Sequence, residues 1–157
     1  MSDQGNRQRD RRLFLKAGAA IGASMVAGSA AADTPSQGSA NEAIRIAIMG
    51  VNNRGSALAR GFLANPGADV VGICDVDARA ADRAVKLVSD KQSNGPKLYT
   101  DIRQVLENPD VDAIVVAAPN HWHAPATIMG CAAGKHVYVE KPCSQTAEEG
   151  VLAVEAS

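Results

Sequence analysis

The stretch that decides the fold is Ile44–Gly55, with the sequence IRIAIMGVNNRG. Its first half, Ile44–Met49, is mostly apolar and predicts a buried β-strand. The turn Gly50–Gly55 follows, and Ser56–Ala64 predicts a helix that ends at Asn65-Pro66-Gly67. A strand, a glycine-containing turn and a helix in this order predict a fold in which strands and helices alternate.

The alternation continues along the rest of the sequence. Further strands are predicted at Asp69–Cys74, Lys97–Tyr99, Ala113–Ala118 and His136–Glu140, and helices at Ala78–Ser89, Ile102–Leu106, Ala124–Ala133 and Thr146–Ala156. Short strands without a polar face are typical of a parallel sheet that helices cover on both sides. We therefore predict an α/β fold, a doubly wound parallel sheet of the Rossmann type, with its ligand site at the carboxyl ends of the strands.

The turn after the first strand has the position of a dinucleotide-binding fingerprint, and its residues are Gly50, Val51, Asn52, Asn53, Arg54 and Gly55. Such a turn uses glycine for the tight bend and for close approach of the pyrophosphate, which the helix N-terminus holds. Asn52 stands where the second glycine belongs. Asn tolerates a left-handed backbone, although its Cβ would crowd the phosphate. A plain turn is the alternative, but the position between strand and helix favours a dinucleotide site.

Asp75 ends the second predicted strand, 20 residues after Gly55. A carboxylate there can accept hydrogen bonds from the adenosine ribose and would repel a 2′-phosphate, which favours NAD over NADP. Arg79 could instead meet a phosphate, so NADP stays the alternative. Asp75 could also cap the next helix, but Asp77 would fill that role at least as well.

Two more segments follow predicted strands at the same edge of the sheet. They are Pro119-Asn120-His121-Trp122-His123 and Glu140-Lys141-Pro142. Together with the G-x-x-x-R-G turn, Cys74-Asp75 and Gly134-Lys135-His136-Val137, they resemble the Gfo/Idh/MocA family of nicotinamide-dependent oxidoreductases. The resemblance covers the chain from Ile44 to its C-terminus.

The resemblance implies roles for the segment after the last strand. Lys141 is similar to the family's catalytic lysine, which contacts the reacting hydroxyl and the nicotinamide side of the cofactor. Glu140 resembles the carboxylate near the nicotinamide ribose, and Pro142 resembles a proline whose peptide is often cis. Without the resemblance, a solvated ion pair of Glu140 and Lys141 at a strand end is the alternative.

The resemblance also places the segment Pro119–His123 beside the cofactor. Asn120 and His123 match the family's loop at this point, and Pro119 opens it. His123 is expected to orient backbone or to cap the next helix rather than to transfer protons. Trp122 is expected to form a wall of the nicotinamide pocket.

The implied activity is hydride transfer between a sugar or cyclitol carbon and the nicotinamide, hence an NAD(P)-dependent oxidoreductase. The alternatives are an NAD-dependent glycosidase of the same family, such as an α-N-acetylgalactosaminidase, and a non-catalytic dinucleotide-binding module. Family members add a C-terminal α+β domain that supplies substrate contacts, a further catalytic histidine and the oligomer interface. We expect no such domain within these 157 residues. We expect the incomplete nucleotide-binding part of a longer homo-oligomeric enzyme, inactive by itself.

The N-terminus has the pattern of an export signal. Residues 1–16 hold five basic and two acidic side chains, and residues 17–32 hold no charge and end in Ala30-Ala31-Ala32. The run Arg11-Arg12-Leu13-Phe14-Leu15-Lys16 resembles a twin-arginine signal. We predict a signal at 1–32, a linker at 33–42 and a dinucleotide domain at 43–157. The translocase would then be a partner and the location extracytoplasmic or periplasmic, with a membrane anchor if cleavage fails; an ordinary N-terminal tail is the alternative.

Composition narrows the function classes further. Five aromatic residues and a net charge of −1 argue against a nucleic-acid partner. No carboxylate or cysteine stands at ligand spacing from the three histidines, so no metal site is predicted. Cys74, Cys131 and Cys143 form no C-x-x-C pair, and we expect buried thiols.

Overall fold

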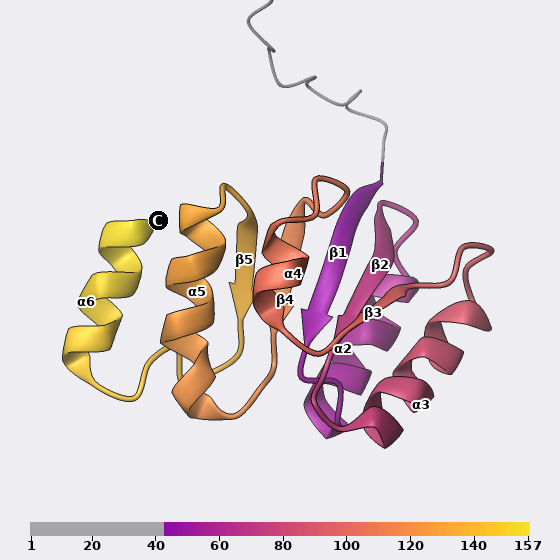
Figure 1. Ribbon diagram of the computed structural model, residues 1–157, viewed down its shortest axis with the longest axis horizontal. Coiled ribbons are helices and arrows are strands. Elements are labelled where there is room, and N and C mark those ends of the chain that lie inside the picture. Colours follow the sequence, from indigo (N-terminus) through magenta and orange to yellow (C-terminus); the bar gives the residue numbers. More distant parts are fainter. Residues whose placement is uncertain (1–42) are drawn as a thin grey trace, which may run out of the picture. The chain divides into compact units, whose positions relative to one another are not determined.

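The computed structural model describes residues 43–157, so the predicted signal and linker lie outside the described residues. One sheet of five parallel strands, in the order β3-β2-β1-β4-β5, forms the centre of this part (Figure 1). The strands are β1 (Ile44–Met49), β2 (Ala68–Cys74), β3 (Lys97–Tyr99), β4 (Ala113–Val116) and β5 (His136–Val139). The predicted doubly wound parallel sheet is confirmed.

Helices cover both faces of this sheet. They are α2 (Asn53–Leu63), α3 (Ala78–Ser89), α4 (Ile102–Leu106), α5 (His123–Ala132) and α6 (Ala147–Ala156), with a short 3₁₀ helix, η1 (Asn120–Trp122). Ile46 and Ile48 of β1 pack with residues of α2 and α3 on one face. Ala47 and Met49 pack with residues of α4 and α5 on the other. Successive β1 side chains therefore serve two cores, which explains why the strand has no polar face.

The turn after β1 departs from its prediction in two respects. The α2 helix begins at Asn53, earlier than expected, because the side chain of Asn52 accepts a hydrogen bond from the Asn53 N–H at 3.3 Å and caps the helix. Asn52 itself is extended, with φ −80°. The left-handed conformation, for which the sequence pointed to Asn52, is found instead at Gly50 (φ 79°) and Asn53 (φ 30°).

Backbone hydrogen bonds continue past the strand ends and align the loops that carry the predicted site. The Gly50 N–H donates to the Cys74 carbonyl at 2.9 Å, and the Ala117 N–H donates to the Met49 carbonyl at 2.8 Å. The Glu140 N–H donates to the Val116 carbonyl at 2.9 Å. These bonds hold the loops after β1, β4 and β5 in one row at the carboxyl edge of the sheet.

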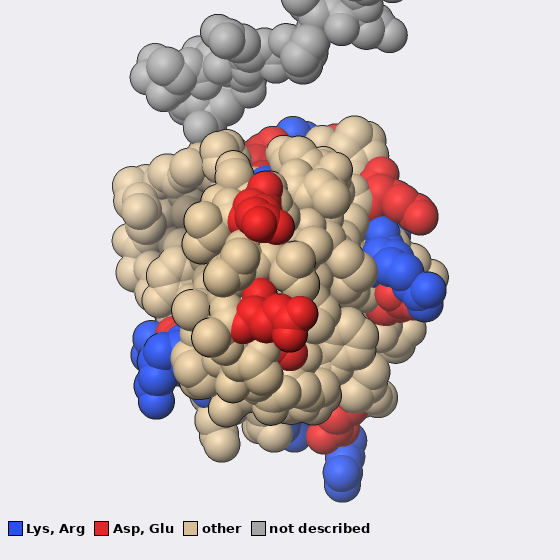
Figure 2. Space-filling view, turned by 90° about the vertical axis from the view of Figure 1, so that its left-hand side faces the viewer, with Lys and Arg blue, Asp and Glu red and all other residues tan. Residues whose placement is uncertain are grey.

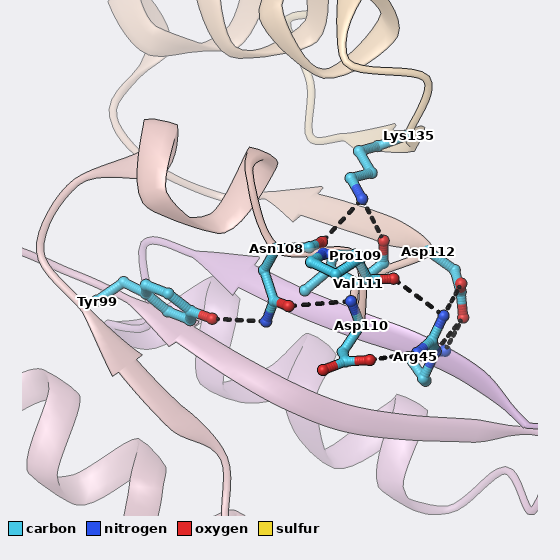
Figure 3. A network of polar contacts seen from close by, with 8 residues as sticks. All are labelled: Arg45, Tyr99, Asn108, Pro109, Asp110, Val111, Asp112 and Lys135. Atoms are coloured by element: carbon cyan, nitrogen blue, oxygen red, sulfur yellow. Dashed lines mark hydrogen bonds and ion pairs between the residues drawn. The ribbon is translucent and has the colours of Figure 1, made fainter.

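The opposite edge of the sheet is held by a polar network (Figure 3). The guanidinium of Arg45 donates to both carboxylate oxygens of Asp112, at 2.8 and 3.0 Å, and to Asp110 at 3.0 Å. The Lys135 ammonium donates to the carbonyls of Asn108 and Val111 at 2.9 and 2.8 Å. This network ties the loop before β4 to β1 and to the residue preceding β5.

The last helix lies beside α5 at the outer side of the domain (Figure 1). Thr146 caps it by accepting a hydrogen bond from the Glu149 N–H at 3.1 Å, while the Glu149 carboxylate accepts one from the Gln145 N–H. Figure 2 shows this side of the molecule as a largely uncharged surface with a few acidic side chains. No helix within residues 43–157 is long and apolar enough to cross a membrane.

Candidate functional site

A first cleft, of about 540 Å³, opens at the carboxyl ends of β1 to β4. Four residues predicted for the cofactor line it: Gly50, Asp75, Pro119 and Trp122. They come from the loops after β1, β2 and β4, which the hydrogen bonds at the strand ends bring together. These four residues thus lie at the carboxyl ends of the parallel strands, where such sheets bind their ligands.

A second cleft, of about 550 Å³, lies next to the first, and Ala118 lines both. The predicted site residues along it are Arg54, Asn120, His123, Glu140 and Lys141. Of the other predicted site residues, Asn52, Asn53 and Gly55 belong to the turn at the start of α2, and Pro142 follows Lys141. The structure therefore gathers the predicted set into two adjoining clefts and the turn beside them.

The glycine turn has the close packing that a phosphate-binding turn requires. A Cβ on Gly50 would lie 2.6 Å from the backbone of Ala118, and a Cβ on Gly55 would lie 1.8 Å from the Gly50 carbonyl oxygen. Both positions accept only glycine, so the turn packs tightly against the start of α2 and the segment after β4. The residues present fit the pyrophosphate of a dinucleotide, with the side chain of Asn52 exposed at the position of the usual second glycine.

Asp75 joins the turn to the end of β2. One carboxylate oxygen accepts a hydrogen bond from the Val51 N–H at 2.8 Å, and the other accepts one from the Asp77 N–H at 2.9 Å. A carboxylate has about four acceptor positions, so two remain for ribose hydroxyls. Asp77, not Asp75, caps α3 by accepting from the Arg79 N–H at 3.0 Å, as the sequence favoured.

Glu140 pairs with Arg54 across the second cleft. Oε1 of Glu140 lies 2.6 Å from both the Nε and a terminal nitrogen of Arg54. The hydrogen bond from Arg54 is the main cause of a lowered Glu140 pKa, and the Arg54 pKa is raised in turn. The alternative of a solvated pair between Glu140 and Lys141 is wrong, since the partner comes from α2.

Lys141 stands at the rim of the second cleft with its side chain exposed. The peptide between Lys141 and Pro142 is cis, as the resemblance implied. The ammonium is therefore open to a ligand in the cleft, where three N–H donors could meet a hydroxyl oxygen.

His123, the first residue of α5, is 2% exposed. Its Nδ1 lies 2.6 Å from the Pro142 carbonyl oxygen and its Nε2 lies 2.8 Å from that of Ala118. Both ring nitrogens face backbone, so the ring contacts the two loops that border the second cleft.

The prediction missed the loop after β3. Thr100, Asp101 and Arg103 line the first cleft, and Asp101 caps α4 while pairing with the Arg103 side chain. That hydrogen bond lowers the Asp101 pKa to about 2. The same rule of parallel strand ends, applied to the short strand at Lys97–Tyr99, could have found these residues.

The cysteines only partly follow their prediction. Cys74 is buried and lines the first cleft, where burial raises its thiol pKa to about 12. Cys131 is half-buried, and Cys143 is exposed because it lies in the loop between β5 and α6. The expectation of buried thiols is therefore wrong for Cys143. No cluster of three or more metal-ligating side chains occurs within residues 43–157.

Comparison with known proteins gives a family match over the whole described domain. The model of the Gfo/Idh/MocA proteins, described as an oxidoreductase family with an NAD-binding Rossmann fold, matches residues 44–156. A glycosyl hydrolase family 109 protein from Saccharopolyspora erythraea is 37% identical over 158 residues, which cover 88% of this chain and 34% of the relative. An α-N-acetylgalactosaminidase from Shewanella oneidensis is 32% identical over 159 residues, 88% of this chain and 35% of the relative.

Among solved structures, the myo-inositol dehydrogenase of Lactobacillus casei in complex with NAD(H) and myo-inositol superposes with a TM-score of 0.67 at 26% identity. The match covers 73% of this chain and 33% of that one. The chain thus spans about a third of the length of the relatives it matches.

Proposed function

We propose that this chain, which belongs to the Gfo/Idh/MocA oxidoreductase family and has its NAD-binding Rossmann fold, is the nucleotide-binding part of an NAD-dependent enzyme. The enzyme oxidises a hydroxyl-bearing carbon of a sugar or cyclitol. The observation that carries this proposal is the second cleft, which Glu140 and Lys141 line together with Arg54 of the glycine turn. A matching structure bound to NAD(H) and myo-inositol supports the substrate class.

The chain's own residues divide the work of holding NAD. Gly50, Gly55 and the first turn of α2 would receive the pyrophosphate, and Asp75 would accept hydrogen bonds from the adenosine ribose. Glu140, ionised beside Arg54, would accept hydrogen bonds from the second ribose. When bound, NAD supplies the acceptor for a hydride from the substrate carbon.

Lys141 is the residue that we propose to act on the substrate. Its ammonium, exposed at the rim of the second cleft, would donate a hydrogen bond to the reacting hydroxyl and orient the carbon that bears it. Trp122, 40% exposed, stands in the wall of the first cleft and would limit water there.

A second candidate is the glycosidase, and the identity of the curated relatives favours it. Two of them, at 37% and 32% identity, are named a glycosyl hydrolase family 109 protein and an α-N-acetylgalactosaminidase. Such an enzyme would start with the same oxidation, eliminate the leaving group, add water and return the hydride. Lys141 and the NAD site would serve both reactions equally, so the residues of this chain do not separate them.

The test uses the natural polypeptide that carries this sequence. Appearance of reduced-cofactor absorbance with inositols or sugars identifies the oxidoreductase. Release of nitrophenol from an aryl α-N-acetylgalactosaminide without net reduction identifies the glycosidase. Lys141→Ala should abolish either turnover and preserve NAD binding; unchanged turnover removes Lys141 from the mechanism. Tight NAD binding with neither activity would leave a binding module.

We also propose that the enzyme is exported by the twin-arginine translocase. The pattern of residues 1–32 supports this, and export of folded protein suits a domain that captures its cofactor before transport. Replacing Arg11 and Arg12 with lysine should retain the protein in the cytoplasm, as measured by cell fractionation. Equal export of both forms would contradict the proposal.

A further inference from the structure

Of the three histidines, all of which lie within residues 43–157, only His123 is buried, at 2% exposed. Its two ring nitrogens lie 2.6 and 2.8 Å from the backbone carbonyl oxygens of Pro142 and Ala118. Both distances are those of hydrogen bonds, and the ring is closed off from water. The structure thus offers the imidazole two partners of the same kind.

Carbonyl oxygens accept hydrogen bonds and cannot donate them. A neutral imidazole has one ring N–H and one bare nitrogen, so it can satisfy only one of the two carbonyls. The bare nitrogen would then face an oxygen lone pair inside the protein, and a buried polar contact of that kind is costly. Only the imidazolium form, which bears a proton on each nitrogen and carries a positive charge, donates to both carbonyls.

We propose that His123 is a positioning residue that donates a hydrogen bond from each ring nitrogen. It thereby holds the backbone of Pro142, which follows Lys141, against the backbone of Ala118, which follows β4. Ala118 lines both clefts, and Pro142 directly follows Lys141. The ring therefore sets the distance between Ala118, which lines both clefts, and Lys141, which we propose acts on the substrate. This inference rests on the proposed role of Lys141.

Charged side chains lie in the cleft that the ring borders and on the helix that packs against α5. Arg54 of α2 and Glu140 after β5 line the same cleft and pair with each other, and Lys141 stands exposed at its rim. On the far side, α6 packs against α5 and carries Glu149, whose carboxylate is engaged by the Gln145 N–H. In the cleft that His123 also borders, the charge of the Glu140 carboxylate is compensated by Arg54.

The first test is spectroscopic and needs no substitution that could unfold the protein. The chain has three histidines, so ¹⁵N-histidine labelling gives three ring systems, and His121→Ala and His136→Ala identify the signals of the two exposed rings. At pH 7, His123 should show both nitrogens bearing slowly exchanging protons. A His123 ring with one bare nitrogen overturns the proposal.

The second test measures binding to the two halves of the dinucleotide site. His123→Gln supplies one donor group in place of two and should weaken NAD binding about tenfold, the effect of one hydrogen bond. Binding of ADP, which lacks the nicotinamide half, should stay within a factor of two. His136→Ala, a change at an exposed histidine at the start of β5, away from both clefts, is the matched control. An equal loss for NAD and ADP, or no loss for NAD, overturns the positioning role.

The two tests separate this inference from the proposed function. Neither uses turnover, so an enzyme that acts on neither substrate class would leave both results readable. Conversely, active enzyme with a singly protonated His123 would refute this inference and leave the proposed function intact.

Discussion

The Arg54 guanidinium, in the first turn of α2, lies 2.6 Å from Oε1 of Glu140, the residue after β5. The two residues are 86 positions apart in the sequence. Their ion pair joins the first and last loops at the carboxyl edge of the sheet, above the end of β4. It orients a carboxylate in the second cleft and keeps it ionised.

Replacing Arg54 should release the carboxylate that it pairs with. In Arg54→Gln the Glu140 pKa should rise toward its ordinary value, because the hydrogen bond that lowers it is lost. Carbon-detected NMR titration of the glutamate carboxyls measures this. Arg60→Gln, an exposed change on the same helix, should leave the Glu140 titration unchanged; a shift in both variants, or in neither, would contradict the assignment.

Gly55 should be intolerant of a side chain, while another glycine of the same helix should gain from one. A Cβ at Gly55 would lie 1.8 Å from the Gly50 carbonyl oxygen, so Gly55→Ala should lower the free energy of unfolding by about 3 kcal/mol or more. A Cβ at Gly61 meets nothing within 4 Å, and Gly61→Ala should raise it by about 0.5–1 kcal/mol. Urea unfolding compares them, and similar effects at both positions would refute the packing argument.

Asp75 should set the preference between the two dinucleotides. Asp75→Ala removes the carboxylate that would repel a 2′-phosphate, and the ratio of NAD to NADP affinity should fall about tenfold. The variant also loses the acceptor of the Val51 N–H, so both affinities should weaken. Calorimetric titration with each dinucleotide gives the ratio. Asp77→Ala, which changes the cap of α3, should not alter it; an unaltered ratio in Asp75→Ala would remove Asp75 from cofactor selection.

The network at the opposite edge should make stability depend on acid pH. The hydrogen bond from Arg45 is the main cause of the lowered Asp112 pKa in the folded protein. A lowered folded-state pKa contributes stability that is present above the unfolded value of about 3.9 and is lost as pH falls through the folded value. The stability difference between wild type and Asp112→Asn should therefore shrink as pH falls below about 4.

Urea unfolding between pH 3 and pH 7 measures that difference. Arg45→Gln should lose the same pH-dependent part of the free energy of unfolding. Adding Asp112→Asn to Arg45→Gln should then change the pH dependence of that free energy little. A difference that grows toward acid pH would contradict the sign of the Asp112 shift.

The thiols should differ sharply in reactivity. Burial raises the Cys74 pKa to about 12, so at pH 8 this thiol should resist alkylation in the folded protein and react only after unfolding. Cys143 is exposed and should react rapidly under native conditions. Mass spectrometry of iodoacetamide-treated protein locates the label. Cys143→Ser should abolish the fast phase, and rapid labelling of Cys74 in the native protein would contradict its burial.

Local patterns predicted the elements closely. The bounds of β1, β3, α3 and α4 agree with the sequence prediction, because each combines an apolar period with a clear boundary residue. The strands β4 and β5 end earlier than predicted, because strand pairing stops where the loops that carry the site begin. Applying the rule of parallel strand ends to these elements was enough to bring Gly50, Asp75 and Lys141 to one edge of the sheet.

These local patterns could not predict the contacts between loops that are distant in the sequence. Nothing near Glu140 in sequence indicates that Arg54 is its partner, or that His123 meets the carbonyls of Ala118 and Pro142. The exposure of Cys143 likewise depends on where the loop before α6 runs.

The sequence by itself determined the order of strands and helices, the glycine turn and the residue types at the strand ends, because these depend on neighbours along the chain. Tertiary structure alone decided which of those residues meet. Parallel pairing brings loops dozens of residues apart into one row, and only in that row do Arg54, Glu140 and His123 acquire their partners.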